Sequence, residues 1–413
     1  MGVNYARLAG FYSIVHGDVE LTQGQCCDVE EAGVRRKLDS VRSVLTVILS
    51  HSPYFLLSLV VSIKGGRMSK QRLLTGHEVE PMSEEWLTKM AQEQSTYEHG
   101  VVRILPDGWL YPGTTPRFLN RIQSFKFRPD DVLVMTFPKS GTTWMQEILW
   151  TMLFNPNLDN PQATQPLLVR SADLSVDMMF DTVTIDEIRP ESMYEAFKKL
   201  CPGKDEEDGI AVQCLDAMPG QRVIKCHYPF DLMPPDLLDK TKVVYVARNP
   251  KDMVVSFYHF YKVIKVFDYK GSLDSFIKLF MDNGVIYSPY WPHIKQGWQK
   301  RNHPNLHFVF YEDLKADPQG EIQKINQFLA TGLTEQQLKN VVQHTSFSSM
   351  KSRGDPLPDQ GIYNKELHQS SGGFYRKGVT GDWKNHFSQE LNHEMDKWIK
   401  DNIGDSGIPF KMD

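Results

Sequence analysis

From about residue 99 onward, short apolar runs alternate with amphipathic segments. Four apolar runs, rich in β-branched and aromatic residues, predict buried strands at 131–137, 221–230, 242–248 and 306–314. Apolar residues at helical spacing predict helices at 145–154, 251–264 and 321–330. Because strands that alternate with helices form βαβ units, the pattern predicts an α/β domain with a central, mostly parallel sheet flanked by helices. The stretch 155–220 is polar and irregular, and we expect a surface insertion or lid there.

The first 97 residues follow a different pattern, and we predict that they form an N-terminal extension to a domain at 98–413. An uncharged, mostly apolar run at 44–63 would span ~30 Å as a helix, which is enough to cross a bilayer. The polar break at 50–53 and the basic residues on both flanks argue against insertion. We therefore favour a buried or loosely packed helix or a partner-binding segment, and a membrane anchor stays open as the alternative.

Composition and charge narrow the classes of protein. With 46 Lys+Arg and 51 Asp+Glu the net charge is −5, which argues against a dedicated nucleic-acid binder. Five Cys are too sparse for a disulfide framework, and they favour a reducing compartment such as the cytoplasm. The sequence contains no metal-ligand motif of the HExxH kind, so we expect no metal cofactor.

The most informative segment, 136–144, reads TFPKSGTTW and lies between a predicted strand and a predicted helix. A Gly-containing turn at that place lets backbone N–H groups and a helix N-terminus face an anion. The side chains available to such an anion are Lys139, Ser140, Thr142 and Thr143, beside Gly141. The Walker A pattern is absent, so this predicts a phosphate loop of another kind; the alternative is a helix merely capped by Ser or Thr.

Two further basic elements suit an anionic ligand. Arg248 ends a predicted strand, and Ser256 lies about two turns into the helix that follows. Arg376 and Lys377 precede Gly378 near the C-terminus. Arginine can bind a phosphate through two hydrogen bonds, although each element alone could equally be a surface ion pair or a solvated turn. Three such elements together predict a ligand with more than one phosphate-like group.

Lys225 and His227 lie two residues apart on a predicted strand and therefore face the same way. A histidine can take a proton from a hydroxyl near neutral pH, and a neighbouring lysine can stabilise negative charge on a transferred group. The alternative for a single histidine is a structural residue held by hydrogen bonds.

Together these segments resemble the cytosolic sulfotransferase family. The family's YPKSGTTW is FPKSGTTW here, its KTHLP is KCHYP, and its YVARNxKDxxVSxYHF is YVARNPKDMVVSFYHF. The C-terminal signature RKGxxGDWKxxF begins at Arg376 and ends at Phe387. The resemblance covers about 105–411, and it implies a P-loop-like, three-layer fold.

The resemblance also implies the sulfate donor 3′-phosphoadenosine 5′-phosphosulfate (PAPS). It assigns the 5′-phosphosulfate to Lys139, Ser140, Gly141, Thr142 and Thr143, and the 3′-phosphate to Arg248, Ser256, Arg376, Lys377 and Gly378. By position, Trp144 and Phe347 would stack on the adenine, with Tyr311, Thr345 and Met350 completing that pocket. The implied reaction is an in-line transfer in which His227 is the base, Lys225 and Lys139 stabilise charge, and Ser256 holds Lys139 until the acceptor is bound.

The acceptor is expected to be small and apolar, such as a phenol or steroid, or else an amine. Aromatic residues expected to line its cavity are Phe230, Phe257, Tyr258, Phe260, Tyr261 and Phe374. The alternatives are a P-loop kinase or NTPase, and a membrane-tethered or non-catalytic scaffold that binds PAPS or its desulfated product PAP. The family's dimer motif KxxxTVxxxE is degraded at 384–393, so a homodimer through that surface is left open.

Overall fold

The computed structural model describes residues 71–94, 100–180, 191–356 and 362–412. Four parallel strands form the main sheet in the order β6-β5-β7-β8. They are β5 (Val132–Thr136), β6 (Val223–Cys226), β7 (Lys242–Ala247) and β8 (Leu306–Phe310). Every residue of β5 is buried, because helices cover both faces of the sheet. The predicted α/β fold with a parallel sheet is confirmed.

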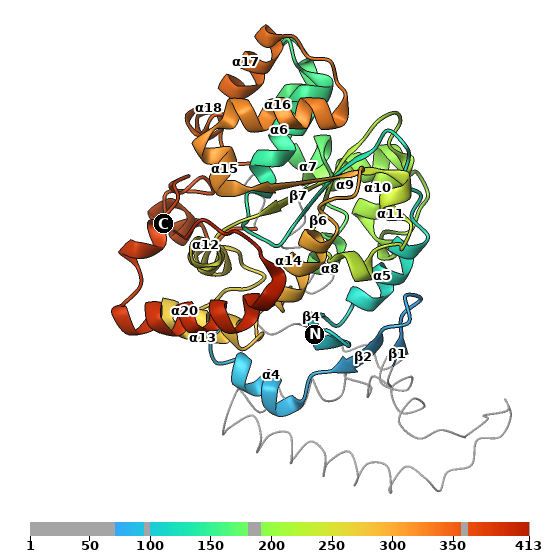
Figure 1. The fold of residues 1–413 in the computed structure, drawn as a ribbon. Helices are drawn as coiled ribbons and strands as arrows, with labels where there is room; N and C mark the ends of the chain where they lie inside the picture. The colour runs from blue at the N-terminus through green and yellow to red at the C-terminus, as the bar shows by residue number, and fades with distance from the viewer. Residues whose placement is uncertain (1–70, 95–99, 181–190, 357–361, 413) are drawn as a thin grey trace, which may run out of the picture. The chain divides into compact units, whose positions relative to one another are not determined.

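Alternating side chains of the strands supply two separate cores. Leu133 and Met135 belong to the larger core, and Val132 and Val134 to the smaller one on the opposite face. The smaller core is covered by α6 (Thr142–Phe154), α16 (Pro318–Leu329) and α17 (Glu335–His344). The larger is covered mainly by α12 (Pro250–Val263), α13 (Leu273–Met281), α14 (Tyr290–Gln299) and α20 (Gln389–Ile403). Figure 1 shows the resulting three layers, with α16 and α6 on one side of β7 and α12 and α14 on the other.

A second, antiparallel sheet has the order β1-β2-β3-β4. Its strands are β1 (Gln71–Arg72), β2 (Glu78–Pro81), β3 (Val101–Leu105) and β4 (Trp109–Pro112), accompanied by α4 (Glu84–Met90) and α5 (Thr115–Gln123). Residues 78–81 are thus hydrogen-bonded to 102–105. The predicted boundary near residue 97 stays a prediction.

The stretch 155–220 is more regular than its sequence suggests. It contains α7 (Leu167–Arg170), α8 (Asp177–Phe180), α9 (Glu191–Leu200) and α10 (Ile210–Ala217), with 3-10 turns η1 (Pro161–Thr164) and η3 (Glu206–Asp208). The Asp177 carboxylate accepts hydrogen bonds from the backbone N–H of Ala211 (2.8 Å) and Val212 (3.0 Å), in the first turn of α10. The expectation of irregular structure was wrong because contacts between distant residues order these helices.

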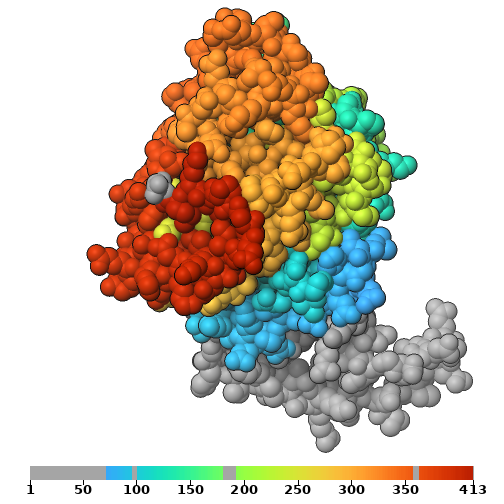
Figure 2. All heavy atoms as spheres, in the orientation of Figure 1, coloured from blue at the N-terminus to red at the C-terminus, as the bar shows by residue number. Residues whose placement is uncertain are grey.

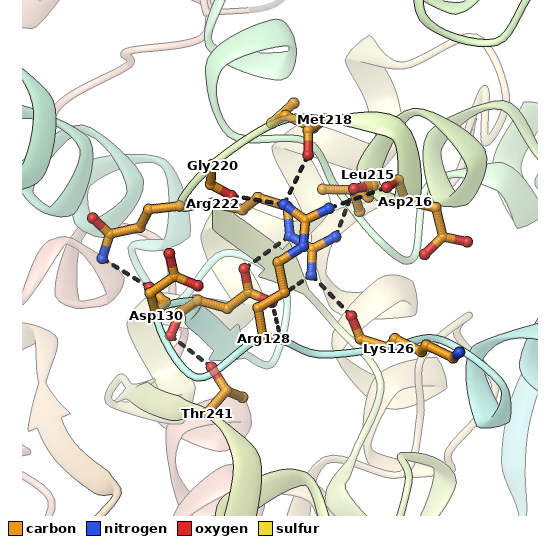
Figure 3. A network of polar contacts seen from close by, with 11 residues as sticks. Lys126, Arg128, Asp130, Leu215, Asp216, Met218, Gly220, Arg222 and Thr241 are labelled. Carbon is orange, nitrogen blue, oxygen red and sulfur yellow. Dashed lines mark hydrogen bonds and ion pairs between the residues drawn. The ribbon is translucent and has the colours of Figure 1, made fainter.

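Two arginines fasten the other end of α10 to the amino ends of β5 and β6 (Figure 3). Arg222 donates to the backbone oxygen of Leu215 (2.6 Å) and forms a fully buried ion pair with Asp131 (2.5 Å). Arg128 donates to the backbone oxygens of Asp216, Met218 and Gly220. Positive side chains at the end of a helix satisfy its last carbonyls and suit its dipole. We call these residues the arginine network.

The carboxyl-terminal residues pack against the larger core. The Phe410 ring contacts the rings of Phe310 (5.6 Å between centroids) and Trp291 (6.1 Å). In Figure 2 the C-terminal segments, in red, lie against the segments drawn in orange, which precede them in the chain. The remaining elements are α11 (Leu237–Lys240), α15 (Tyr311–Ala316), α18 (Phe347–Ser352), α19 (Lys365–Ser370), and the turns η4 (Phe230–Leu232), η5 (Asp382–Asn385) and η6 (Gly404–Ser406).

Two strand predictions extend too far. The run predicted at 306–314 is a strand only to Phe310, and Tyr311 begins α15. Likewise the run at 221–230 is a strand only over Val223–Cys226. Within the described residues, no helix is long and apolar enough to cross a bilayer. The run at 44–63 lies outside those residues, so both interpretations of it stay predictions.

Candidate active site

The carboxyl ends of β5, β6 and β7 surround one cavity, which lies where open α/β sheets bind ligands. The cavity brings together all but one of the residues expected at the site. These are Lys139, Gly141, Thr142, Thr143, Trp144, Lys225, His227, Arg248, Ser256, Tyr311, Thr345, Phe347, Met350, Arg376, Lys377 and Gly378. The exception is Ser140, which is fully buried and whose hydroxyl has no hydrogen-bond partner.

The turn between β5 and α6 has the shape of an anion cradle. Gly141 caps α6 with φ of 103°, and Lys139 has φ of 67°, so the chain turns sharply before the helix. A Cβ on Gly141 would come within 2.7 Å of the Tyr311 ring. The Thr142 hydroxyl is hydrogen-bonded to the Thr136 hydroxyl (2.7 Å), which ties the first turn of the helix to the strand.

The Lys139 ammonium contacts two aromatic rings that line the cavity. Its Nζ is 4.5 Å from the centroid of Phe260 and 4.8 Å from that of Phe374. Burial, and then the positive charges of Arg248, Lys225 and Arg376, lower the pKa of the Lys139 ammonium to about 7. An anionic ligand would offset the repulsion among these cations.

Arg248 links the three basic elements. Its Nη1 donates to the backbone oxygen of Lys139 (3.1 Å), its Nη2 to that of Val379 (3.4 Å), and its guanidinium lies 4.4 Å from the Tyr311 ring centroid. The buried Nε has no partner. The guanidinium is therefore held in place, and the Nε–H is a donor that remains available to a ligand.

The C-terminal basic pair is held by a carboxylate that the sequence analysis did not assign. Asp382 accepts hydrogen bonds from Arg376 (2.8 Å) and Lys377 (2.6 Å). Although burial opposes it, hydrogen bonds from Lys377, Asn385 and Arg376 hold the pKa of the Asp382 carboxyl below its usual range. In the sequence, the only indication of this contact is that Asp382 belongs to the same signature, RKGxxGDWKxxF, as Arg376 and Lys377.

Aromatic residues form one side of the cavity beside the cations. Trp144 and Tyr311 meet edge to face, 5.6 Å between centroids. Phe347 packs so closely over the backbone of Gly378 that a Cβ there would lie 2.8 Å from its Cγ and closer still to two other ring carbons. Flat aromatic faces beside paired cations suit a purine nucleotide that carries phosphates.

His227 is 7% exposed and its tautomer is set by the backbone. Nδ1 lies 2.9 Å from the carbonyl oxygen of Thr136, which can only accept, so Nδ1 carries the proton and Nε2 the lone pair. Burial and the charge of Lys225 lower the pKa of the His227 imidazole to about 3. The ring is therefore neutral near pH 7 and can accept a proton at Nε2.

Lys225 lies in β6, just before His227, and forms an ion pair with Asp173 (2.7 Å). Asp173 also lines the cavity and was not singled out in the sequence, where it lies in a polar stretch without a motif. Although burial opposes it, the charge of Lys225 lowers the pKa of the Asp173 carboxyl. Cys226 points the other way, into the larger core, with Sγ 3.7 Å from Met233 Sδ.

Beyond His227 the cavity becomes apolar. We call the apolar part contributed by the insertion the acceptor wall; it consists of Leu167, Leu168, Val176 and Met179. On α12 only the face carrying Ser256 and Phe260 borders the cavity. Of the six aromatic residues expected there, Phe260 and Phe374 line it, whereas Phe230, Phe257 and Tyr261 belong to the larger core and Tyr258 packs against that core.

Among the described residues, no group of three His, Cys, Asp or Glu could hold a metal ion. The expectation that the reaction needs no metal stays a prediction, as does the cytoplasmic location inferred from the cysteines.

Comparison with known proteins agrees with this geometry. A family model described as "Sulfotransferase domain" matches residues 129–407. Human Sulfotransferase 1E1 is 32% identical over 302 residues, which are 72% of this chain and 92% of that protein. Among solved structures, retinol dehydratase in complex with retinol and PAP has a TM-score of 0.68 and 28% identity, over 81% of this chain and 99% of that chain. The complex with androsterone and inactive cofactor PAP has a TM-score of 0.67 and 27% identity, over 81% and 98%.

The fold, the cavity and these matches define an enzyme of the PAPS-dependent sulfotransferase class. More specifically, the chain belongs to the cytosolic sulfotransferase family, so the predicted family, fold and enzyme class are confirmed.

Proposed function

We propose that the protein transfers the sulfuryl group of PAPS to a hydroxyl or amine of a small apolar acceptor, with His227 as the base. The observation that supports this proposal is the protonation state of His227. Its imidazole is neutral, its Nε2 can accept a proton, and Lys225, two residues before it, lines the same cavity. That arrangement suits removal of a proton from an acceptor while negative charge develops on the transferred group.

The residues of the cavity fit the donor. Bound there, PAPS would supply the activated sulfuryl group, and PAP would be left. Lys139 and the Gly141 turn suit the 5′-phosphosulfate, and Arg248, Arg376 and Lys377 suit the 3′-phosphate. The unpartnered Nε of Arg248, which lines the cavity, is a buried donor that such an anion would satisfy.

In the proposed reaction, His227 removes the acceptor proton and Lys225 binds the sulfuryl oxygens as the bond to the acceptor forms. Lys139 neutralises the oxygen of the 5′-phosphate as the bond to the donor breaks, and Ser256 holds Lys139 beforehand. No covalent step on the protein is needed, because positioning and electrostatic stabilisation suffice for in-line transfer from the phosphate oxygen to the acceptor atom.

The acceptor proposal rests on the apolar end of the cavity. Phe267 and Tyr287 line it together with the acceptor wall, and the Tyr287 ring lies 5.6 Å from that of His227. Such a surface binds flat or polycyclic alcohols better than charged sugars. The retinol dehydratase complexes hold retinol and androsterone, both apolar alcohols, and we include this class among the acceptors to test.

The test is transfer of labelled sulfate from PAPS to a panel of phenols, steroid and polyene alcohols and aryl amines. His227→Ala should lower kcat about a hundredfold or more, because general-base catalysis of this kind contributes that much. The variant should still bind PAP, which shows that its cavity is intact. Transfer that persists in His227→Ala would refute the base, and tight PAP binding without transfer to any acceptor would favour the non-catalytic scaffold.

A further inference from the structure

The charges that line the cavity are almost all of one sign. Its described lining contains six cations and a single carboxylate, Asp173; the cations are Lys139, Lys225, Arg248, Lys315, Arg376 and Lys377. Cations are expected around an anionic donor, whereas a buried carboxylate opposes its binding. Asp173 is 4% exposed, so its presence beside the reacting groups calls for a different explanation.

Asp173 is held rigidly against the catalytic strand. The backbone N–H of Lys225 donates to Ala172 O (2.9 Å) and that of Leu174 donates to Lys225 O (2.8 Å), so residues 172–174 run beside β6. The Oδ1 atom accepts from the backbone N–H of Ser175 (2.9 Å) and from its hydroxyl (2.6 Å). The carboxylate is thus fixed by its backbone and by Ser175, independently of the lysine side chain.

The second carboxylate oxygen, Oδ2, faces the lysine. Oδ2 lies 2.7 Å from Lys225 Nζ, and the Lys225 side chain is 19% exposed against 5% for Asp173. An ammonium has three N–H donors, so one bond to Asp173 leaves two for a ligand. A flexible lysine side chain that is tied to a fixed carboxylate has fewer orientations to lose when it binds the transferred group.

We propose that Asp173 is the positioning residue for Lys225: it holds the ammonium beside His227 so that its free donors meet the sulfuryl group during transfer. This inference rests on the proposed function of Lys225. The proposal gives the insertion at 155–220 a part in the reaction, because Asp173 of the insertion contacts Lys225 of β6. The competing explanation is a buried ion pair that only stabilises the fold.

The two explanations differ in kinetics. Asp173→Asn removes a negative charge from the donor's surroundings and frees Lys225, so PAP should bind as tightly as to the wild type or more tightly. Because the lost interaction orients a group that acts in the transition state, kcat should nevertheless fall about tenfold or more. Asp173→Glu, which retains the charge on a longer side chain, should restore part of kcat.

A double variant tests whether Asp173 acts through Lys225. In a Lys225→Met background, Asp173→Asn should lower kcat no further, because its target is gone. The matched control is Glu147→Gln, which breaks another buried ion pair of the same length, Glu147 with Arg170 (2.7 Å), outside the cavity lining. Glu147→Gln should reduce the free energy of unfolding without the loss of kcat.

Three results would overturn the proposal: kcat of Asp173→Asn within twofold of the wild type, an equal loss in the Lys225→Met background, or weaker PAP binding by Asp173→Asn. The PAP titration needs no turnover, so it tests Asp173 even if no acceptor reacts. If the wild type transfers sulfate and His227→Ala does not, the proposed function stands whatever Asp173→Asn shows.

Discussion

Replacing Gly378 by Ala should weaken nucleotide binding through a steric effect on one ring. Gly378 has φ of 63°, and a Cβ there would overlap the Phe347 ring, which we propose stacks on the adenine. Phe347 cannot keep its place once that Cβ is present, so we expect the ring to shift from its position in the cavity lining.

The expected magnitude has two parts. The left-handed backbone conformation costs an alanine about 1–2 kcal/mol of folding free energy. Loss of one aromatic face against a base costs about 1–3 kcal/mol of binding, which is a rise in the Kd for PAP of roughly five- to 150-fold. The first part should appear in unfolding, and the second only in titration with PAP.

Gly372→Ala separates these parts. Gly372 also has a left-handed conformation, with φ of 89°, but nothing lies within 4 Å of the position of its Cβ. It should therefore lose similar stability in urea unfolding and keep the wild-type affinity for PAP in calorimetric titration. An equal rise in Kd for the two variants would refute the role of Phe347.

Two more predictions concern buried charges. Arg222→Gln leaves Asp131 buried without its ion-pair partner, so urea unfolding should show a free energy of unfolding lower by about 3–5 kcal/mol. A decrease of less than about 1 kcal/mol would contradict the importance of the arginine network. Because the pKa of Lys139 is lowered to about 7, this side chain is mostly neutral at pH 8. An anion that binds beside Lys139 raises this pKa, so the protein should take up a proton from solution when the anion binds. Calorimetric titration with PAP at pH 8, in buffers of different ionisation enthalpy, should show proton uptake by the wild type and none by Lys139→Met. Equal uptake by the wild type and the variant would contradict the assignment of the proton to Lys139.

The sequence predicted the parallel sheet because its strands are continuous apolar runs. The run at 242–248 is a strand of the predicted kind. The run at 306–314 was extended too far because Tyr311 and Leu314 are apolar enough to continue a strand, although α15 buries both. The helices of the insertion escaped prediction, since α10 is held in part by residues far from it in the sequence: Asp177 is 34 residues from Ala211, and Arg128 is 90 residues from Met218.

The site was predicted where short motifs carry the chemistry, and missed where distant contacts do. Within the FPKSGTTW segment, every residue except Phe137 and Ser140 lines the cavity, together with Arg248 and Arg376. Asp173 was missed because its role depends on a pairing with β6 that no local pattern shows. On α12 the aromatic residues were assigned together, although Phe257 is fully buried in the core and its neighbour on the helix surface, Phe260, borders the cavity.

The insertion that supplies the acceptor wall is attached to the main sheet at two places. One is the arginine network at the amino ends of β5 and β6, and the other is the bridge of residues 172–174 to β6. Side chains of the acceptor wall contribute to neither attachment. Since we propose that this wall contacts the acceptor, we expect substitutions there to change which molecule is chosen while the fold and the transfer chemistry are retained. In this architecture the choice of acceptor would then diverge between relatives independently of the reaction.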